Sequence, residues 1–306
     1  MKISTENYIT LSSESHKEII HFFSENNDSL VFDNITPEKL HSFKQLTEEI
    51  KAIKQNVNQK GFMVLKPLQE LSLHENRFLS WIVISLLGEP LVQNKEGAKI
   101  IHVYDRDRTK KMEDGARYHQ TRQGGSIHTD NVNVPVKWEY LVMHCVATAM
   151  VGGETILLNG NDIYNYLKES LPDVLSTLEA PFYWEYRGIS DGTYQAPIVT
   201  YSEEGVAQFR YLRDYLESAH QKSGNPLTAK QLSALDALDS ILEISDLQSR
   251  FFLEQGETLI INDSQVFHGR TTFSDFENAE VVDLDFTAGK RYKRTIDRAW
   301  VKEING

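Results

Sequence analysis

A histidine and a carboxylate lie two residues apart near the middle of the chain, at His128 and Asp130. The surrounding segment, 126–134, has the composition of a strand, and side chains at positions i and i+2 of a strand point to the same face. The imidazole and the carboxylate could therefore bind one metal ion. The pair alone is not specific, because His128 could be a hydrogen-bonded core residue and Asp130 could begin a turn.

A second histidine, His268, follows the strand-like segment 256–263 far along the chain. Two histidines and one carboxylate on one face, with open positions opposite them, are the ligand set of non-haem Fe(II) oxygenases. Taken alone, His268 could simply end a strand before Gly269. The joint occurrence of His128, Asp130 and His268, on strands at both ends of a β-rich region, favours an iron site.

Two arginines, Arg294 and Arg298, lie in the strand-like segment 293–301 near the end of the chain. On a strand they share one face with Ile296. Guanidinium groups inside a barrel are costly unless anions meet them, and arginine is suited to binding carboxylates through two hydrogen bonds. Beside an iron site, we expect one arginine to bind a cosubstrate carboxylate and the other a substrate carboxylate. On a solvent-exposed face they would make only surface salt bridges.

The composition is that of an ordinary globular protein with an excess of acidic residues, which gives a net charge of −12. Because phosphate binding needs clustered Lys and Arg, this charge argues against nucleic-acid and anionic-membrane partners. No apolar run approaches the roughly 18 residues that a membrane span needs, and the first residues lack a secretory signal pattern. The single cysteine, Cys145, fits a reducing compartment. We expect a cytoplasmic protein with a small-molecule substrate and no nucleic-acid or membrane partner, and the sequence leaves homo-oligomer formation open.

The sequence pattern predicts four helices and many short strands. The helices are expected at 36–58, at 75–87, from a cap at Asn161 or Asp162 through about 169, and at 227–243, the last one capped by Thr228. The expected strands, separated by glycine-containing turns, are 62–65, 126–134, 140–146, 154–158, 182–186, 197–201, 208–211, 250–253, 257–261 and 295–301. Many short strands with a few helices inserted predict a mainly β fold with flanking helices around a double-stranded β-helix, the cupin-like jelly roll.

No repeat, low-complexity tract or linker divides the chain, which predicts a single domain over residues 1–306. We expect a helical and strand decoration over about 1–90, a jelly-roll core over about 91–301, and an inserted helical and lid segment over about 203–248. The stretch 105–117, rich in Lys, Arg and Asp, lies just before His128. We interpret it as a loop that could act as a lid over the site.

These motifs together resemble those of the Fe(II)/2-oxoglutarate-dependent dioxygenases of the taurine dioxygenase and clavaminate synthase-like group. The matching pieces extend from about Leu87 to Val301 and are His128-Thr129-Asp130, Gly152-Gly153-Glu154-Thr155, Gly256-Glu257 through Asn262-Asp263 to His268-Gly269-Arg270, and Arg294 to Arg298. The combination is much more specific than any single piece.

The resemblance implies a role for each matching residue. The metal ligands for Fe(II) would be His128, Asp130 and His268. Thr155 and Arg294 would hold the far carboxylate of 2-oxoglutarate, and Arg298 would bind the carboxylate of the substrate. The interval between His268 and Arg294 is longer than expected for the family, so Arg291 competes with Arg294 for this role. The odd spacing of Arg291 from Arg298 would point it to the opposite face of a regular strand, and we therefore keep Arg294.

The resemblance also implies an enzyme that uses Fe(II), 2-oxoglutarate and O2 to hydroxylate an unactivated C–H bond. The motifs around His128 and Arg298 look most like those of hydroxylases of free L-amino acids, especially basic ones such as L-lysine or L-arginine. Asp214, with Glu217 behind it, is the acid that we expect to meet a side-chain cation, unless this segment is the solvated face of a short helix. The alternatives are a dioxygenase acting on another small acid or a carrier-bound amino acid, and a jelly-roll binding protein without catalysis.

Overall fold

The computed structural model describes residues 3–26, 31–32, 35–107, 109, 120–135, 137–186, 190–282, 286–287 and 290–304. The helices in these ranges are α1 (Ser13–Glu25), α2 (Pro37–Leu40), α3 (Lys44–Lys60), α4 (Leu73–Leu87), α5 (Gly160–Ser170), α6 (Pro172–Leu178), α7 (Arg213–Lys222) and α8 (Ala229–Leu242). The strands are β1 (Tyr8–Ile9), β2 (Phe62–Leu65), β3 (Glu89–Pro90), β4 (Ile101–Val103), β5 (Gly125–His128), β6 (Tyr140–Ala147), β7 (Val151–Gly152), β8 (Thr155–Asn159), β9 (Pro181–Glu185), β10 (Thr193–Pro197), β11 (Val199–Tyr201), β12 (Ala207–Phe209), β13 (Gln248–Phe251), β14 (Thr258–Asn262), β15 (Val266–Arg270), β16 (Phe273–Ser274) and β17 (Thr295–Lys302).

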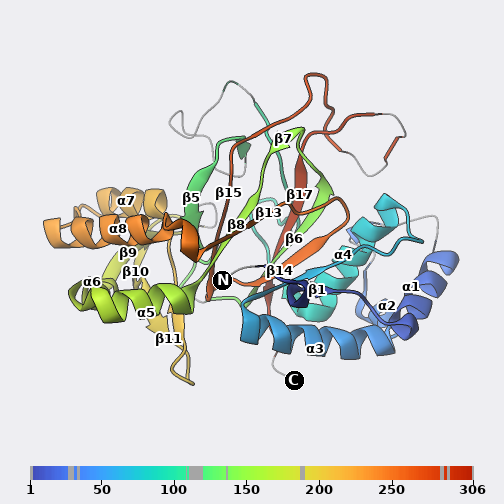
Figure 1. Cartoon of the computed structure of the whole chain (residues 1–306), viewed down its shortest axis with the longest axis horizontal. Coiled ribbons are helices and arrows are strands. Elements are labelled where there is room, and N and C mark those ends of the chain that lie inside the picture. The colour runs from blue at the N-terminus through green and yellow to red at the C-terminus, as the bar shows by residue number, and fades with distance from the viewer. Residues whose placement is uncertain are drawn as a thin grey trace.

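Two main sheets form the centre of the molecule (Figure 1). The larger has the order β1-β2-β14-β6-β17-β3, with β4 also paired to β17, and the smaller has the order β13-β8-β15-β5. Within these sheets only the short β1–β2 pair is parallel among the described strands. This arrangement confirms the predicted mainly β fold with a jelly-roll core and flanking helices.

Apolar side chains from the inner faces of both sheets form the core between them. Leu157 of β8 and Val266 of β15 share one buried cluster with Leu259 of β14 and with Ile296 and Trp300 of β17. Because side chains alternate along a strand, the even-numbered residues of β17 face this core, as the sequence pattern predicts. The last strand therefore brings its arginine face to the inside of the barrel.

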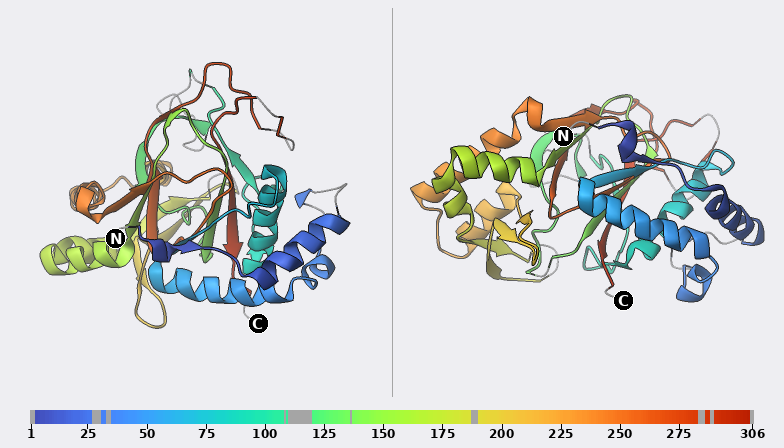
Figure 2. Two further views of the ribbon diagram at one scale, coloured as in Figure 1. Left: turned by 45° about the vertical axis from the view of Figure 1, so that its right-hand side comes forward. Right: turned by 60° about the horizontal axis from the view of Figure 1, so that its bottom comes forward.

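The N-terminal helices cover the outer face of the larger sheet, and the residues that precede 90 also supply strands to it (Figures 1 and 2). Because β2 pairs with β14 near the middle of this sheet, the segment 1–90 is more than the decoration that the sequence predicts. The helix expected over 36–58 is divided into α2 and α3. Phe43 leaves the helical conformation, with φ −93° and ψ 72°, and packs its buried ring on Phe22 of α1.

The segment between β8 and β13 packs on the outer face of the smaller sheet, on the side opposite the N-terminal helices (Figure 2). It contains α5 to α8 and β9 to β12, so the inserted region begins near residue 160 rather than near 203. Most of the loop expected over 105–117 lies outside the described residues. None of the helices in the described ranges has the length and hydrophobicity needed to cross a membrane.

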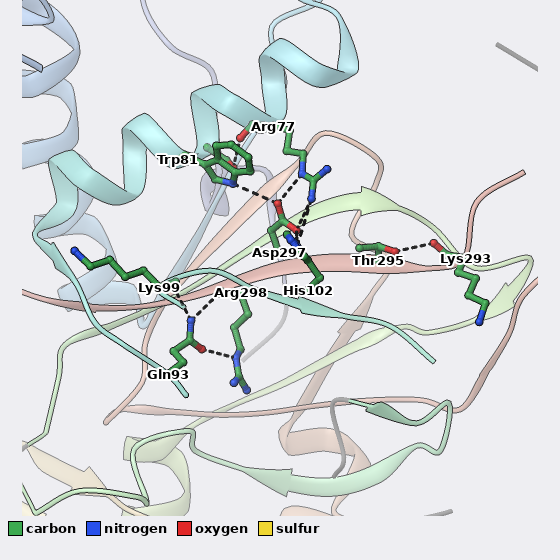
Figure 3. Close-up of polar contacts among 10 residues, drawn as sticks. Arg77, Trp81, Gln93, Lys99, His102, Lys293, Thr295, Asp297 and Arg298 are labelled. Atoms are coloured by element: carbon green, nitrogen blue, oxygen red, sulfur yellow. Dashed lines mark hydrogen bonds and ion pairs between the residues drawn. The ribbon is translucent and has the colours of Figure 1, made fainter. Parts of the chain in front are cut away.

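A buried charged cluster fastens the outward face of β17 to α4 and β4 (Figure 3). The carboxylate of Asp297, which is fully buried, accepts hydrogen bonds from Nε and Nη2 of Arg77 at 2.7 and 3.1 Å and lies 2.6 Å from Nδ1 of His102. Trp81 donates a further hydrogen bond to it at 3.3 Å. Burial would raise the pKa of Asp297, but His102 and Arg77 outweigh burial and hold this pKa well below its ordinary value of 3.8. The cluster fixes β17 from outside, one residue before Arg298.

We expect Asp297→Asn to lower the free energy of unfolding at pH 7 by about 3–5 kcal/mol, because Arg77 would then be buried without a counter-charge. Urea denaturation would measure this loss. The double variant Arg77→Met/Asp297→Leu, which replaces both charges by apolar groups, should recover most of the stability. Because the pKa of folded Asp297 is lowered, its contribution is complete above about pH 4 and is lost as the pH falls further, so the single variant and the wild type should converge in acid. A single variant as stable as the wild type at pH 7 would contradict the assignment.

Candidate active site

The three predicted metal ligands meet at one end of the smaller sheet. His128, at the end of β5, pairs directly with His268 of β15. The Nε2 atoms of the two rings lie 3.4 and 3.7 Å from Oδ1 of Asp130, and one ligand atom from each residue lies within 4.8 Å of the others. All three side chains are buried. In the described part of the chain this is the one cluster of three or more His, Cys, Asp or Glu residues that could hold a metal ion.

Asp130 is positioned by tertiary contacts rather than by the continuation of β5 that the sequence pattern predicts. The strand ends at His128, and the N–H of Thr129 donates to the carbonyl of Tyr211 at 2.8 Å. The backbone N–H of Asp130 then donates to Oδ1 of Asp263 at 3.0 Å. The shared face of His128 and Asp130 is real, but a buried acid and the inserted region maintain it.

Contacts made by the other polar atoms of His128 and Asp130 indicate which of their atoms face the metal. Nδ1 of His128 lies 2.6 Å from the carbonyl of Ser126, which places the proton on Nδ1 and the lone pair on Nε2. Oδ2 of Asp130 accepts a hydrogen bond from Nε1 of Trp300 at 2.8 Å and forms an ion pair with Nη1 of Arg298 at 2.9 Å. Oδ1 is therefore the oxygen available to a metal. This donor set fits Fe(II).

The electrostatic surroundings hold these groups in their metal-binding forms at neutral pH. Burial would raise the pKa of Asp130, but Arg298 and the two imidazoles outweigh it and keep this pKa well below 3.8. Burial, with the neighbouring His128, lowers the pKa of His268 to about 4. Burial and the charge of Asp130 raise the pKa of Asp263 to about 8, which favours its neutral form beside the ionised Asp130. Its Oδ1 lies 3.9 Å from Nδ1 of His268, too far for a hydrogen bond.

The residues expected at the far carboxylate of 2-oxoglutarate face the barrel interior or lie buried beside it. Thr155 begins β8, on the same face as the core residue Leu157. The buried Arg294 directly precedes β17, with its guanidinium carbon 5.2 Å from the ring centre of Phe273. Arg294 also lines a cavity of about 250 Å³ together with the core residue Ile296. A Cβ atom on Gly153, two residues before Thr155, would lie 2.9 Å from Nε of Arg294.

Arg291, the competing choice for Arg294, is exposed. Its guanidinium carbon lies 4.5 Å from the ring centre of Phe276, outside the barrel core. The buried position of Arg294 makes it the better placed of the two for an anion inside the barrel.

A second, larger cavity of about 700 Å³ opens onto the metal cluster. His128, Asp130, Arg298 and Trp300 line it, together with the buried Gln93. Nε of Arg298 donates to Oε1 of Gln93 at 3.0 Å (Figure 3), and among the described residues Nη2 of Arg298 has no hydrogen-bond partner. The guanidinium therefore offers a free N–H group beside the metal cluster, where a carboxylate could bind.

Asp214 is not brought to this cavity, and its expected role in binding a side-chain cation is not supported by its position. It is exposed in the first turn of α7, whereas its neighbour Tyr215 lines the cavity. The helix buries Leu216 and turns Asp214 to solvent, and Glu217 is paired with Arg213 at 2.5 Å. The structure supports the alternative interpretation, in which this segment is the solvated face of a short helix.

Other acidic side chains do line the cavity. Apart from Asp130, the described acids in its wall are Glu96 and Asp191, and both are exposed.

Three residues that contact the site were not identified from the sequence. Trp300 could have been found, because it continues the alternation of Arg294 and Arg298 along β17. Asp263, which the motif contains without a role, lies in a turn and Gln93 in an irregular segment, where no periodicity indicates which way a side chain points.

We expect Trp300→Phe to weaken Fe(II) binding by about 10–100-fold, because Oδ2 of Asp130 loses one of its two donors. Trp138→Phe is the matched control. The ring of Trp138 stacks on Trp300 at 4.4 Å, but its own Nε1 has no hydrogen-bond partner among the described residues. Competition with a metal chelator would measure both affinities, and equal effects of the two substitutions would contradict a role for the Trp300 N–H.

Comparisons with known proteins agree with this geometry. The sequence profile described as "Taurine catabolism dioxygenase TauD, TfdA family" matches residues 20–283. The taurine hydroxylase-like protein SAT17 of Stachybotrys chartarum is 26% identical over 242 residues, which are 75% of this chain and 60% of that protein. The FR-33289 synthase of Streptomyces rubellomurinus is 23% identical over 244 residues, 78% of this chain and 68% of the synthase. The chain thus spans about 60–68% of the length of these curated relatives.

Solved structures of two iron oxygenases are among those that share the fold. The asparagine oxygenase AsnO, in complex with Fe(II), 3-hydroxyasparagine and succinate, superposes with a TM-score of 0.69 at 14% identity, covering 97% of this chain and 93% of AsnO. The non-haem iron oxygenase OrfP, in complex with Fe, succinate and (3S)-hydroxy-L-Arg, gives a TM-score of 0.64 at 13% identity, covering 97% and 94%. The match to the family profile covers most of the chain, and the protein belongs to the TauD/TfdA family of dioxygenases, which use Fe(II), 2-oxoglutarate and O2.

Proposed function

We propose that this dioxygenase hydroxylates an unactivated C–H bond of a free L-amino acid. The observation that carries the proposal is the position of Arg298, which lines the cavity at the metal cluster and has an unpaired Nη2 among the described residues. A guanidinium in this place suits the α-carboxylate of a small substrate. The hydroxylated asparagine and arginine in the AsnO and OrfP complexes support the same substrate class.

In this proposal each residue of the site has a defined task. His128, Asp130 and His268 bind Fe(II), and Thr155 and Arg294 hold the far carboxylate of 2-oxoglutarate. Bound Fe(II) supplies the activation of O2, coupled to conversion of 2-oxoglutarate to succinate and CO2.

The other contribution of the chain is orientation and the exclusion of water. Arg298 aligns the substrate through its carboxylate. Trp300 and Arg298 together hold Oδ2 of Asp130, so that the ligand geometry does not depend on substrate contacts alone. A reducing cytoplasm suits this chemistry, and the single cysteine, Cys145, is buried and free.

The side chain of the substrate is a narrower question. L-Lysine or L-arginine would have to meet Glu96 or Asp191 rather than Asp214, because those two acids line the cavity. A second candidate substrate is another small acid such as a sulfonate. Two further cations of the cavity wall, Lys95 and Arg106, favour this candidate, and one curated relative is described as taurine hydroxylase-like.

We expect anaerobic addition of Fe(II) and 2-oxoglutarate to the apo-protein to produce the weak visible absorption band of the iron chelate. Because a substrate bound at Arg298 lies beside the metal, its addition should shift this band. Free L-amino acids, their α-carboxamides and taurine would be compared, and only the free amino acids should shift it. A shift with taurine alone would replace the amino acid by a sulfonate, and a folded protein without any band would contradict the dioxygenase assignment.

Arg294→Met should weaken 2-oxoglutarate binding by about 10–100-fold, since a buried charge-assisted pair of hydrogen bonds to the carboxylate would be lost. Arg291→Met is the control and should leave the affinity within about twofold, because an exposed charge outside the barrel contributes little. Titration of the chelate band measures both. A larger loss of affinity in Arg291→Met than in Arg294→Met would show that Arg291 binds the carboxylate of 2-oxoglutarate.

A further inference from the structure

A polar side chain in the wall of the large cavity lacks a partner. Asn133 lines this cavity three residues after Asp130. Its side-chain amide makes no hydrogen bond with any residue in the described part of the chain, although Oδ1 is shielded from solvent. Buried polar atoms are rarely left unpaired, because each loses its hydrogen bonds to water without gaining a partner. An unpaired amide that borders a ligand cavity is explained if the ligand supplies the partner.

The hydroxyl of Tyr194 contacts the backbone on both sides of Asn133. The hydroxyl of Tyr194, on β10 of the inserted region, lies 3.0 Å from the carbonyl oxygen of Val132 and 3.1 Å from that of Val134. Its ring packs against that of Tyr186 at 5.0 Å. The segment that carries Asn133 is therefore fixed at the residue before it and at the residue after it.

A buried arginine supports this phenol. Arg210 donates from Nη1 to the hydroxyl of Tyr194 at 2.6 Å and from Nη2 to the carbonyl of Pro135 at 2.8 Å. It is 1% exposed and forms no ion pair with a carboxylate among the described residues. Burying a cation without a counter-ion is unfavourable, and here the guanidinium is held by the hydroxyl of Tyr194 and the carbonyl of Pro135. Arg210 and Tyr194 thereby fix the segment 132–135, of which Val132 and Asn133 line the cavity.

Apolar side chains lie beside Asn133 in the cavity wall. Val132, beside Asn133, and Leu212, in the segment whose backbone pairs with Thr129, line the same cavity with buried apolar side chains. The charged residues Glu96 and Asp191 of the cavity are exposed. Asn133 is therefore well placed to hydrogen bond a substrate that has entered.

We propose that Asn133 contacts the side chain of the bound amino acid and selects one that carries a nitrogen hydrogen-bonding group, a carboxamide, guanidinium or ammonium. Tyr194 and Arg210 are the positioning residues that hold Asn133 toward the cavity. The inference rests on the proposed function, because it requires an amino-acid substrate. An apolar side chain of the same size would leave the amide unpaired, and a site built to hydrogen bond discriminates strongly against such an analogue.

The test compares substrates that differ in this group alone. L-Asparagine is paired with the isosteric L-leucine, and L-lysine with L-norleucine. Binding is measured by calorimetry on the anaerobic protein loaded with Fe(II) and 2-oxoglutarate, where no turnover occurs. The wild type should prefer the nitrogen-bearing member of at least one pair, and Asn133→Ala should reduce that preference about tenfold by weakening the nitrogen-bearing member.

The positioning role has a matched control. Tyr194→Phe removes the hydroxyl but keeps the ring on Tyr186, and it should lower the same preference and raise KM while leaving kcat and Fe(II) affinity nearly unchanged. Tyr211→Phe also removes a buried hydroxyl bonded to a charged partner, Asp239, but this hydroxyl does not face the segment 132–135. Both variants should lose thermal stability, and only Tyr194→Phe should change the preference.

The outcomes separate the two proposals. If Asn133→Ala keeps the preference of the wild type, the role of Asn133 is overturned while the amino-acid hydroxylase assignment stands. If the wild type binds none of the four amino acids while another free L-amino acid shifts the chelate band, the role of Asn133 is overturned and the hydroxylase assignment stands. If no free L-amino acid shifts the band, both are overturned. If Tyr194→Phe and Tyr211→Phe behave alike, Tyr194 is structural and its positioning role is overturned.

Discussion

The site depends on how the two oxygens of one carboxylate are used. Oδ2 of Asp130 is held by the indole of Trp300 and the guanidinium of Arg298, which leaves Oδ1 directed at the two imidazoles. Both donors come from one strand, two residues apart on its inner face. The strand can supply them only if its register and its rotation are fixed, and the buried Asp297 on the opposite face fixes both by bonding to α4 and β4. The buried ion pairs of Asp297 on the outer face of β17 thus help to keep Arg298 and Trp300 in place on its inner face.

The N-terminal helices and the inserted region, which cover the two outer faces of the barrel, differ in how they contact the metal site. The N-terminal helices pack on the larger sheet, and α4 binds β17 through the Arg77–Asp297 pair. The inserted region packs on the smaller sheet, and it touches the site directly: its backbone pairs with Thr129 between two metal ligands, and Tyr194 holds the segment after them. We infer that variation in the inserted region changes which substrate fits, whereas variation in the N-terminal helices changes mainly stability.

The sequence predicted the parts of the site that follow from the periodicity of strands and from motif spacing. The alternation along 294–300 indicated the inner face of β17, and the pairing of a His-X-Asp motif with a distant histidine indicated the metal cluster. Contacts made by loops and turns were beyond it: Asp263 and Gln93 carry no periodic signal. The prediction for Asp214 was not supported, because the direction of an acid on a short helix depends on which of its neighbours are buried. Here burial of Leu216 turns Asp214 to solvent. The break at Phe43 is a tertiary effect, since burial of its ring outweighs the continuity of the predicted helix.

Gly153 and Arg294 lie far apart in the chain, yet their close packing leaves no room for a side chain at residue 153. Gly153 has φ +80°, and a Cβ there would lie 2.9 Å from Nε of the arginine. Any side chain at 153 would therefore both strain the backbone and displace the guanidinium. The absence of a side chain at residue 153 thus helps to set where the guanidinium of Arg294 can lie, although the two residues belong to distant parts of the sequence.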